Sequence, residues 1–433
     1  MPSDRCLRYY KDRMPIYLFA ASIIFVVAVA RKRQIRALSP YGIFVAFQIL
    51  YNITPWGTAA LGVGGRLFSL LSDQHIVNIQ LVLSATANLC FGLVHLAFFR
   101  NVKFTQPLSP SRRTRRNYLY LAFPLFFVTC VLCHFYGWHQ YTFAGHLVDQ
   151  ETLGGMFTVT AYFKFVFVAV YLYYLYRFGL DKYAWILVCE QVVVMVVDGA
   201  RTTFLPVLLV TLFILLDRVT DKKMMRRIYG LAIAGIVLSI GTRSLIFHDS
   251  SLLQDMIIPV TVEGGLGDYS SLQSIQGVEK LAQPPYTYGA SYLVDPFVFL
   301  IPKSIGRVSL SPFGNWSDSL TDILEDKFSP MGGFYYLSEA VAAYSYAGPA
   351  IVTTIFAGFL VWIERNKNRH RMLYLAWMPT IGILFVKTQF GNGMKLFLIE
   401  FLAIYLIFIL SKARILFIRS QRNARGNLAP AAT

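Results

Sequence analysis

Charged side chains are scarce in this sequence, and acidic ones are the scarcer kind. Asp, Glu, Lys and Arg together make up 15% of the 433 residues, with 23 acidic against 40 basic side chains. There are only five cysteines, an odd number, which argues against a secreted scaffold held by disulfides. Hydrophobic residues make up 56% of the chain and form long runs, which excludes an ordinary soluble globular protein.

Familiar soluble-enzyme motifs are also missing. The sequence has no P-loop, no GxGxxG, no GxSxG, no HExxH and no Asp-x-Asp pair that would hold a metal with a nucleotide diphosphate. An enzyme that uses nucleotide-activated substrates would be expected to carry one of these motifs. We therefore expect no metal or other cofactor, and we expect any donor substrate to be activated by a lipid carrier.

The apolar runs have the length of membrane-spanning helices. A bilayer core of about 30 Å is crossed by about 17 to 25 helical residues. The tyrosines between Tyr171 and Tyr176 are interpreted as part of an interfacial aromatic belt. We predict an all-α, polytopic integral membrane protein with about eleven spans, at residues 15–30, 41–63, 76–99, 118–136, 156–176, 183–199, 203–216, 228–247, 346–363, 372–390 and 395–411.

Basic residues mark the cytoplasmic side. Six alternate connections hold 26 of the 40 Lys and Arg residues but only four acids, Asp181, Asp217, Asp221 and Glu364. By the positive-inside rule these connections and the C-terminus are cytoplasmic. Because the bases are distributed between spans and not gathered on one domain, we expect no nucleic-acid partner. The six connections are residues 31–36, 100–116, 177–182, 217–227, 364–371 and 412–425.

One long loop has the opposite charge. Between His248 and Ser345 there are eleven acids and four bases, a net charge of −7. We predict transmembrane helices at 1–246, a large extracytoplasmic loop at 247–345, and further transmembrane helices with a basic cytoplasmic tail at 346–433. The loop is expected to be partly helical or re-entrant, and residues 293–300 are apolar enough to dip into the membrane surface.

Ionisable residues inside the predicted spans are candidates for function, because burying a charge in a bilayer is costly. Four of them are cations in the predicted outer half of the bilayer, namely Lys164, Arg201, Arg243 and Lys387. They could line one outward-facing pocket that suits a lipid-linked phosphate or diphosphate. The alternative is that each snorkels to the headgroups or pairs with Asp198 or Glu400; Glu190 completes the set of seven.

Glu339 is the candidate general base. It lies one or two helical turns before the predicted span at 346–363, near the predicted depth of the cations. Burial would raise the pKa of this carboxyl and a neighbouring Arg would lower it, and the sequence leaves open which effect is larger. The alternative is a structural acid that is favoured at the N-terminal end of a helix by the helix dipole.

Three short stretches and the long loop together resemble the Wzy-type O-antigen and oligosaccharide repeat-unit polymerases of the bacterial inner membrane. The stretches are Gly199–Thr202 with Phe204 and Leu205, Ile301–Lys303, and the run from Pro330 through Gly332, Gly333 and Glu339 to Gly348. The resemblance implies a multi-pass, GT-C-like fold and a metal-independent glycosyltransferase. It also implies a donor glycan on undecaprenyl diphosphate, a lipid-linked repeat unit as acceptor, contacts with membrane lipids, and a chain-length regulator as a partner.

The resemblance further implies roles for individual residues. Glu339 would accept the proton of the acceptor hydroxyl, while Arg201 and Arg243 would stabilise the departing lipid diphosphate. Two alternatives remain open. An O-antigen ligase would use the same donor with a lipid A core acceptor, and a non-enzymatic flippase or transporter would be expected to show inverted repeats. Substrate contacts are assigned to Lys387, Thr202, Lys303, Arg307 and Asn392, and no metal ligand is assigned.

Overall fold

The protein is mostly helical in the part that its computed structural model describes. The described residues form helices and turns and no strand, which confirms the predicted all-α class for them. The described residues are 4–37, 39–60, 74–105, 118–119, 123–131, 165–198, 204–219, 221, 223–230, 234, 287–298, 300–301, 336–377, 390, 393–395, 397–406 and 409.

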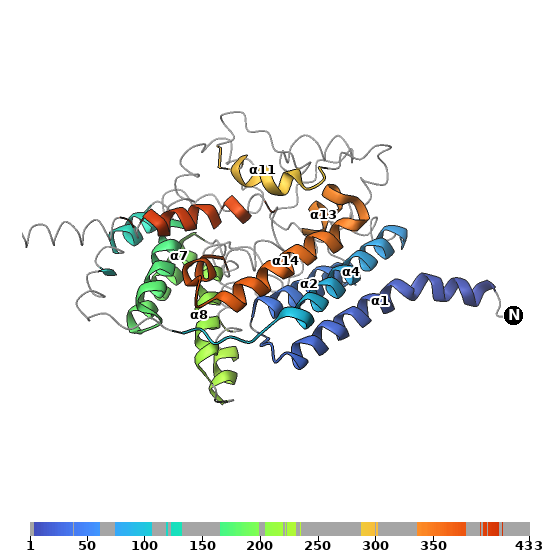
Figure 1. Cartoon of the computed structure of the whole chain (residues 1–433), viewed down its shortest axis with the longest axis horizontal. Helices are drawn as coiled ribbons and strands as arrows, with labels where there is room; N and C mark the ends of the chain where they lie inside the picture. The colour runs from blue at the N-terminus through green and yellow to red at the C-terminus, as the bar shows by residue number, and fades with distance from the viewer. Residues whose placement is uncertain are drawn as a thin grey trace, which may run out of the picture. The chain divides into compact units, whose positions relative to one another are not determined.

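Figure 1 shows the helices of the described residues. Predicted segments 41–63, 183–199 and 203–216 each correspond to a helix whose bounds differ from the prediction by at most a few residues. Two further helices, α11 and α13, lie inside the predicted loop at 247–345. The elements are α1 (Asp4–Lys32), α2 (Pro40–Ala60), α4 (Gln74–Phe98), α7 (Lys182–Asp198), α8 (Phe204–Arg218), α11 (Ala290–Val298), α13 (Tyr336–Tyr344), the 3₁₀ turn η2 (Ser345–Ala347) and α14 (Gly348–Asn366).

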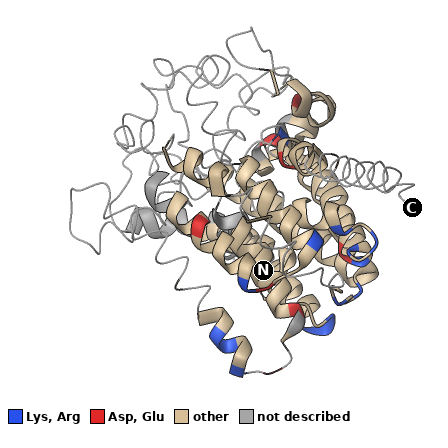
Figure 2. Ribbon diagram, turned by 90° about the vertical axis from the view of Figure 1, so that its left-hand side faces the viewer, with Lys and Arg blue, Asp and Glu red and all other residues tan. Residues whose placement is uncertain are grey.

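Three described helical segments are long and apolar enough to cross a membrane: Met14–Lys32, Gln74–Phe98 and Ser345–Asn366. The shortest has 19 residues, which at 1.5 Å per residue gives about 28 Å and matches the hydrocarbon core. These segments confirm the helices predicted at 15–30, 76–99 and 346–363. The other eight spans and the GT-C-like arrangement stay predictions. Most of the described ribbon carries neither acidic nor basic residues (Figure 2).

The chain divides into two compact units, each made of stretches that are distant in sequence. One comprises Met1–Thr105 and Leu208–Phe397, and the other comprises Gln106–Val207 and Leu398–Thr433. In the first unit α4 packs against α1, α2 and α14, and α13 packs against α14. The predicted division at residues 246 and 345 follows the charge pattern and stays a prediction.

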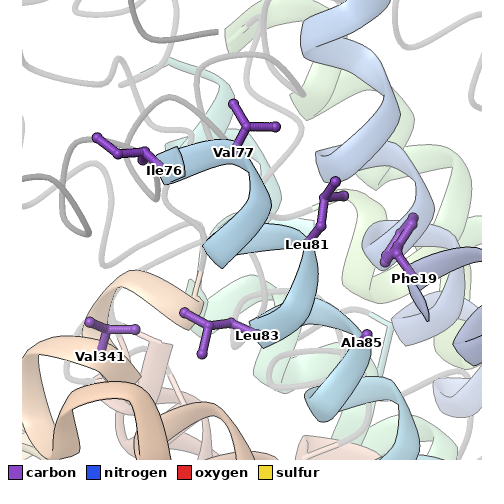
Figure 3. Close-up of a cluster of buried hydrophobic side chains, with 7 residues drawn as sticks. All are labelled: Phe19, Ile76, Val77, Leu81, Leu83, Ala85 and Val341. Atoms are coloured by element: carbon purple, nitrogen blue, oxygen red, sulfur yellow. The ribbon is translucent and has the colours of Figure 1, made fainter. Parts of the chain in front are cut away.

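A cluster of buried hydrophobic side chains joins α1, α4 and α13 (Figure 3). Phe19 of α1 and Val341 of α13 contribute to this cluster, and α4 supplies the rest. Val341 is fully buried and lies two residues after Glu339. The helix that carries the candidate base is therefore held by the core of its unit. The α4 members are Ile76, Val77, Leu81, Leu83 and Ala85.

Three tyrosines of the second unit are buried. Tyr171, Tyr173 and Tyr174 are at most 3% exposed, so their interpretation as belt residues is wrong. They lie inside because the helix packs against other aromatic rings, and the Tyr174 hydroxyl donates to Asp181 at 2.9 Å. Asp181 also accepts the backbone N–H groups of Tyr183 and Ala184, which caps the start of α7.

Candidate functional site

Glu339 is a buried carboxylate in the first turn of α13. Glu339 is only 2% exposed, and its Oε2 accepts a 2.7 Å hydrogen bond from the backbone N–H of Phe390. Oε1 is also buried, and among the described residues it has no hydrogen-bond partner. A buried carboxylate oxygen without a partner is unfavourable unless it is protonated or bound by another group.

Burial is the largest of the effects that the described residues exert on the pKa of Glu339, and the effect of a neighbouring Arg stays a prediction because Arg201 and Arg243 lie outside the described residues. Burial raises the pKa to about 8 and is the largest effect, the Phe390 N–H lowers it, and the nearby Asp295 carboxylate raises it. The alternative of a structural acid at a helix start is correct about position, because Glu339 does lie in the first turn of α13. Its Oε2, however, is bound by the N–H of a distant segment.

The short helix α11 brings two further polar residues to this carboxylate. Asp295 is 1% exposed and close enough to influence the charge of Glu339. Tyr292 packs its ring edge-to-face on Phe390, with centroids 5.0 Å apart. The Tyr292 hydroxyl is buried and has no hydrogen-bond partner among the described residues. Burial raises the pKa of Tyr292 well above its usual range, with a smaller contribution from Glu339, so this phenol stays neutral.

Sequence reasoning missed Asp295 and Tyr292 as site residues. One signal was available, because Asp295 is the only charged residue between Tyr286 and Ile301. A charge in so apolar a segment is expected to face the protein interior. Tyr292 carries no comparable signal, since nothing in its local sequence distinguishes it from the tyrosines around it.

α13 is positioned by a hydrogen-bonded tyrosine one turn before Glu339. The Tyr336 hydroxyl accepts a 3.0 Å bond from Gln48 Nε2 on α2 and lies 2.9 Å from the Thr353 hydroxyl on α14. At the other end of α13, Gly348 comes so close to the Ala340 carbonyl that a Cβ would lie 1.8 Å from its oxygen. Gly348, one of the residues that carry the family resemblance, is thus required by backbone packing.

α11 is fixed to the end of α13 through its N-terminal turn. The Tyr288 N–H donates to the Ala343 carbonyl at 3.0 Å. Gly289 has φ +83° and lies against the Tyr344 hydroxyl, where a Cβ would be 1.8 Å from the hydroxyl oxygen. The Thr287 hydroxyl, just before α11, lies 3.0 Å from the Ser291 hydroxyl in the first turn of α11 and forms a hydrogen bond with it. α11, α13 and Phe390 therefore form one packed site around Glu339.

The remaining predicted site residues cannot be compared with this geometry. Glu339 is the one member of the predicted set that the structure describes. The residues that lie outside the described residues are Arg201, Thr202, Arg243, Lys303, Arg307, Lys387 and Asn392, and the predicted intramembrane cation Lys164 lies outside them as well.

A small cavity at the opposite end of α14 belongs to a different feature. It holds about 50 Å³, room for a few water molecules, and is lined by an ion-pair network centred on Asp217. Asp217 accepts bonds from Lys367 Nζ at 2.8 Å, from Arg36 at 3.1 Å and from the Phe104 N–H at 3.2 Å. The charges are paired with one another, which indicates a structural junction between helix ends.

Comparison of the chain with protein-family models, with curated proteins and with solved structures finds no match.

Proposed function

We propose that this chain is a membrane glycosyltransferase that polymerises lipid-linked oligosaccharide repeat units at a site centred on Glu339. One observation carries the proposal. A buried carboxylate with a raised pKa, and with one oxygen that has no partner among the described residues, lies a few residues before a helix long and apolar enough to span a membrane. The charge pattern assigns that end of the helix to the extracytoplasmic face, where the diphosphate of a lipid-linked sugar would lie.

The proposed reaction is a single displacement. The hydroxyl oxygen of the acceptor sugar attacks the anomeric carbon of the donor glycan, and the bond from that carbon to the diphosphate oxygen breaks. The electron pair of the broken bond stays on undecaprenyl diphosphate, and the hydroxyl proton passes to the Glu339 carboxylate. Attack from the face opposite the leaving group gives inversion. Glu339 then returns its proton to water before the next round.

In this proposal, residues other than Glu339 supply the positive charges that stabilise the diphosphate leaving group. Arg201 and Arg243 would stabilise the departing diphosphate electrostatically, and no metal is required. Asp295 and Tyr292 join the site as neighbours of Glu339, the first by raising its pKa and the second as a buried hydroxyl able to donate to a sugar oxygen. Lys387, Thr202, Lys303, Arg307 and Asn392 are the proposed substrate contacts.

The cellular setting follows from the same proposal. The enzyme would work in the bacterial inner membrane as a multi-pass, GT-C-like protein, with its active site on the periplasmic side. Its partners would be the lipid-linked oligosaccharide, the surrounding lipids and a chain-length regulator.

A reconstituted assay tests the proposal. The purified protein, in proteoliposomes with the lipid-linked repeat unit, is expected to produce a ladder of longer glycans on the lipid diphosphate. Glu339→Gln should slow formation of the ladder by about 10²- to 10⁴-fold, because the amide cannot accept the proton. Glu190→Gln is a matched control, since Glu190 is a partly buried glutamate in the apolar helix α7 of the other unit. Transfer to lipid A core in place of the ladder would indicate a ligase, and a normal ladder with Glu339→Gln would refute the site.

A further inference from the structure

α11 buries polar side chains together with Pro296, and exposes apolar ones. Ser291 and Asp295, one turn apart, are each 1% exposed. Leu293 and Phe297, also one turn apart, are 75% and 64% exposed, Val294 of the same helix is exposed, and so is Ile301 just after the helix ends. A helix at a protein–water surface has the reverse arrangement. The exposed side of α11 therefore requires an apolar environment.

The start of α11 is fixed at the level where a membrane-spanning segment begins. The Tyr288 N–H donates to the Ala343 carbonyl, and Ala343 lies two residues before Ser345, the first residue of that segment. Even a fully extended chain of two residues spans no more than about 7 Å, so Ala343 lies close to the start of that segment. The first turn of α11 therefore lies at the boundary between the hydrocarbon core and the headgroups.

The spanning helix α14 also exposes apolar side chains. Ile351 and Ile355 on α14 are exposed, as expected of side chains that face lipid. Tyr288 and Tyr346 are exposed near the junction of the two helices, which is the depth where amphipathic aromatic rings collect. The one charged residue of α11 is the buried Asp295, so no charge on the exposed side opposes insertion into lipid.

We infer that α11 is a membrane-interface helix that inserts Leu293, Val294 and Phe297 among lipid acyl chains while Ser291 and Asp295 face the protein. The occupant of this surface is the bilayer that already holds α14. The inference rests on the membrane character of α14 and does not depend on the proposed polymerase activity. It has a consequence for the site, because a lipid-linked substrate could approach Glu339 sideways from the bilayer, past a helix that is itself embedded in lipid.

Spin labelling in lipid nanodiscs tests this placement. Nitroxides are attached at Leu293→Cys and Phe297→Cys, in a chain whose five native cysteines are serine, in discs of phosphatidylethanolamine and phosphatidylglycerol. Both labels should collide with oxygen more than with a water-soluble nickel chelate, as a label at Ile355 on α14 should. A label at the exposed Lys223 provides the water reference. Nickel accessibility equal to that at Lys223 would overturn the inference, and so would low collision with both reagents, which would indicate that protein covers this face.

A second measurement keeps the native cysteines. Photoreactive benzoylphenylalanine in place of Phe297 is irradiated in the same nanodiscs, and the adducts are identified by mass spectrometry. A lipid adduct is expected, as it is for the same residue in place of Ile355. An adduct with another protein segment, or no adduct where Ile355 gives one, contradicts the inference. Neither readout requires glycan polymerisation, so failure here is distinguishable from failure of the proposed function.

Discussion

The backbone N–H of Phe390 donates a 2.7 Å hydrogen bond to Oε2 of Glu339, while the Phe390 ring packs edge-to-face on Tyr292. One residue thus connects both helices of the site, its main chain to α13 and its side chain to α11. Of the two carboxylate oxygens of Glu339, Oε2 is therefore bonded and Oε1 has no partner among the described residues. The carboxylate is held by one oxygen and has the other available for a substrate proton.

The raised pKa of Glu339 predicts how activity depends on pH. Below pH about 8 the carboxyl is mostly protonated and cannot accept the hydroxyl proton, so kcat/KM for chain extension should rise with pH and level off above that value. Asp295→Asn removes a neighbouring charge that raises this pKa, so the midpoint should move to lower pH. The measurement is the initial rate of ladder formation across neutral and alkaline pH.

Glu339→Gln completes this test. It should lower the rate by about 10²- to 10⁴-fold, the usual contribution of a general base, and abolish the pH-dependent rise. A rise with the same midpoint in Glu339→Gln would assign the titration to another group. A midpoint unchanged by Asp295→Asn would contradict the electrostatic coupling of the two carboxylates.

Two tyrosines of the site should respond differently to loss of the hydroxyl. Tyr336→Phe removes a hydroxyl that bonds to Gln48 and Thr353, and should reduce the free energy of unfolding by about 1–3 kcal/mol. Tyr292→Phe removes a buried hydroxyl without a partner among the described residues and keeps the ring on Phe390, so thermal stability should be unchanged or higher. Chain extension should nevertheless slow if this hydroxyl contacts substrate. A large loss of stability in Tyr292→Phe would show that the hydroxyl has a structural partner.

The sequence predicted the features that depend on residues close together in the chain, such as apolar helices and the position of Glu339 before one of them. Hydrophobic runs long enough to cross a bilayer predicted the helices Met14–Lys32, Gln74–Phe98 and Ser345–Asn366. The position of Glu339 just before one of these helices followed from counting residues along the chain. The four acids of the predicted cytoplasmic side stood out against the surrounding bases. Two of them, Asp217 and Glu364, contact the buried Lys367.

The contacts around Glu339 could not be predicted, because they join segments distant in sequence. Every residue except proline has a backbone N–H, so no pattern distinguishes Phe390 as a donor. The closeness of Asp295 depends on how α11 is fixed to α13. Uncharged polar residues inside apolar helices did offer a signal that was not used. Gln48 and Ser84 are fully buried, and such groups require hydrogen-bond partners in an apolar interior.

Gly289→Ala should loosen α11 from α13. The position has φ +83°, and the added Cβ would lie 1.8 Å from the Tyr344 hydroxyl oxygen, so backbone strain and a clash act together. We expect a loss of about 2 kcal/mol or more in the free energy of unfolding. Combining it with Tyr344→Ala should cost less than the sum of the two single changes.

Gly358→Ala on α14 is the matched control for this prediction. Nothing lies within 4 Å of its added Cβ, and alanine favours a helix over glycine by about 0.5–1 kcal/mol. Thermal unfolding in detergent should therefore show a lower midpoint for Gly289→Ala and an equal or higher one for Gly358→Ala. Strict additivity in the double variant would argue against the predicted contact.

Asp217→Asn should be among the more destabilising single changes, although it lies far from Glu339. Asp217 pairs with Lys367, whose side chain is 4% exposed, and with Arg36, and the change removes the negative charge from both pairs, so that Glu364 at 3.4 Å is the remaining carboxylate beside Lys367 among the described residues. Removing one partner of a buried ion pair typically costs about 3–5 kcal/mol, and the value here should fall toward the lower end because Arg36 is partly exposed. Asp221→Asn is the control, since the exposed Asp221 caps the Lys223 N–H and Asn caps equally well. Equal unfolding midpoints for the two variants would show that the network at this end of α14 contributes little to stability.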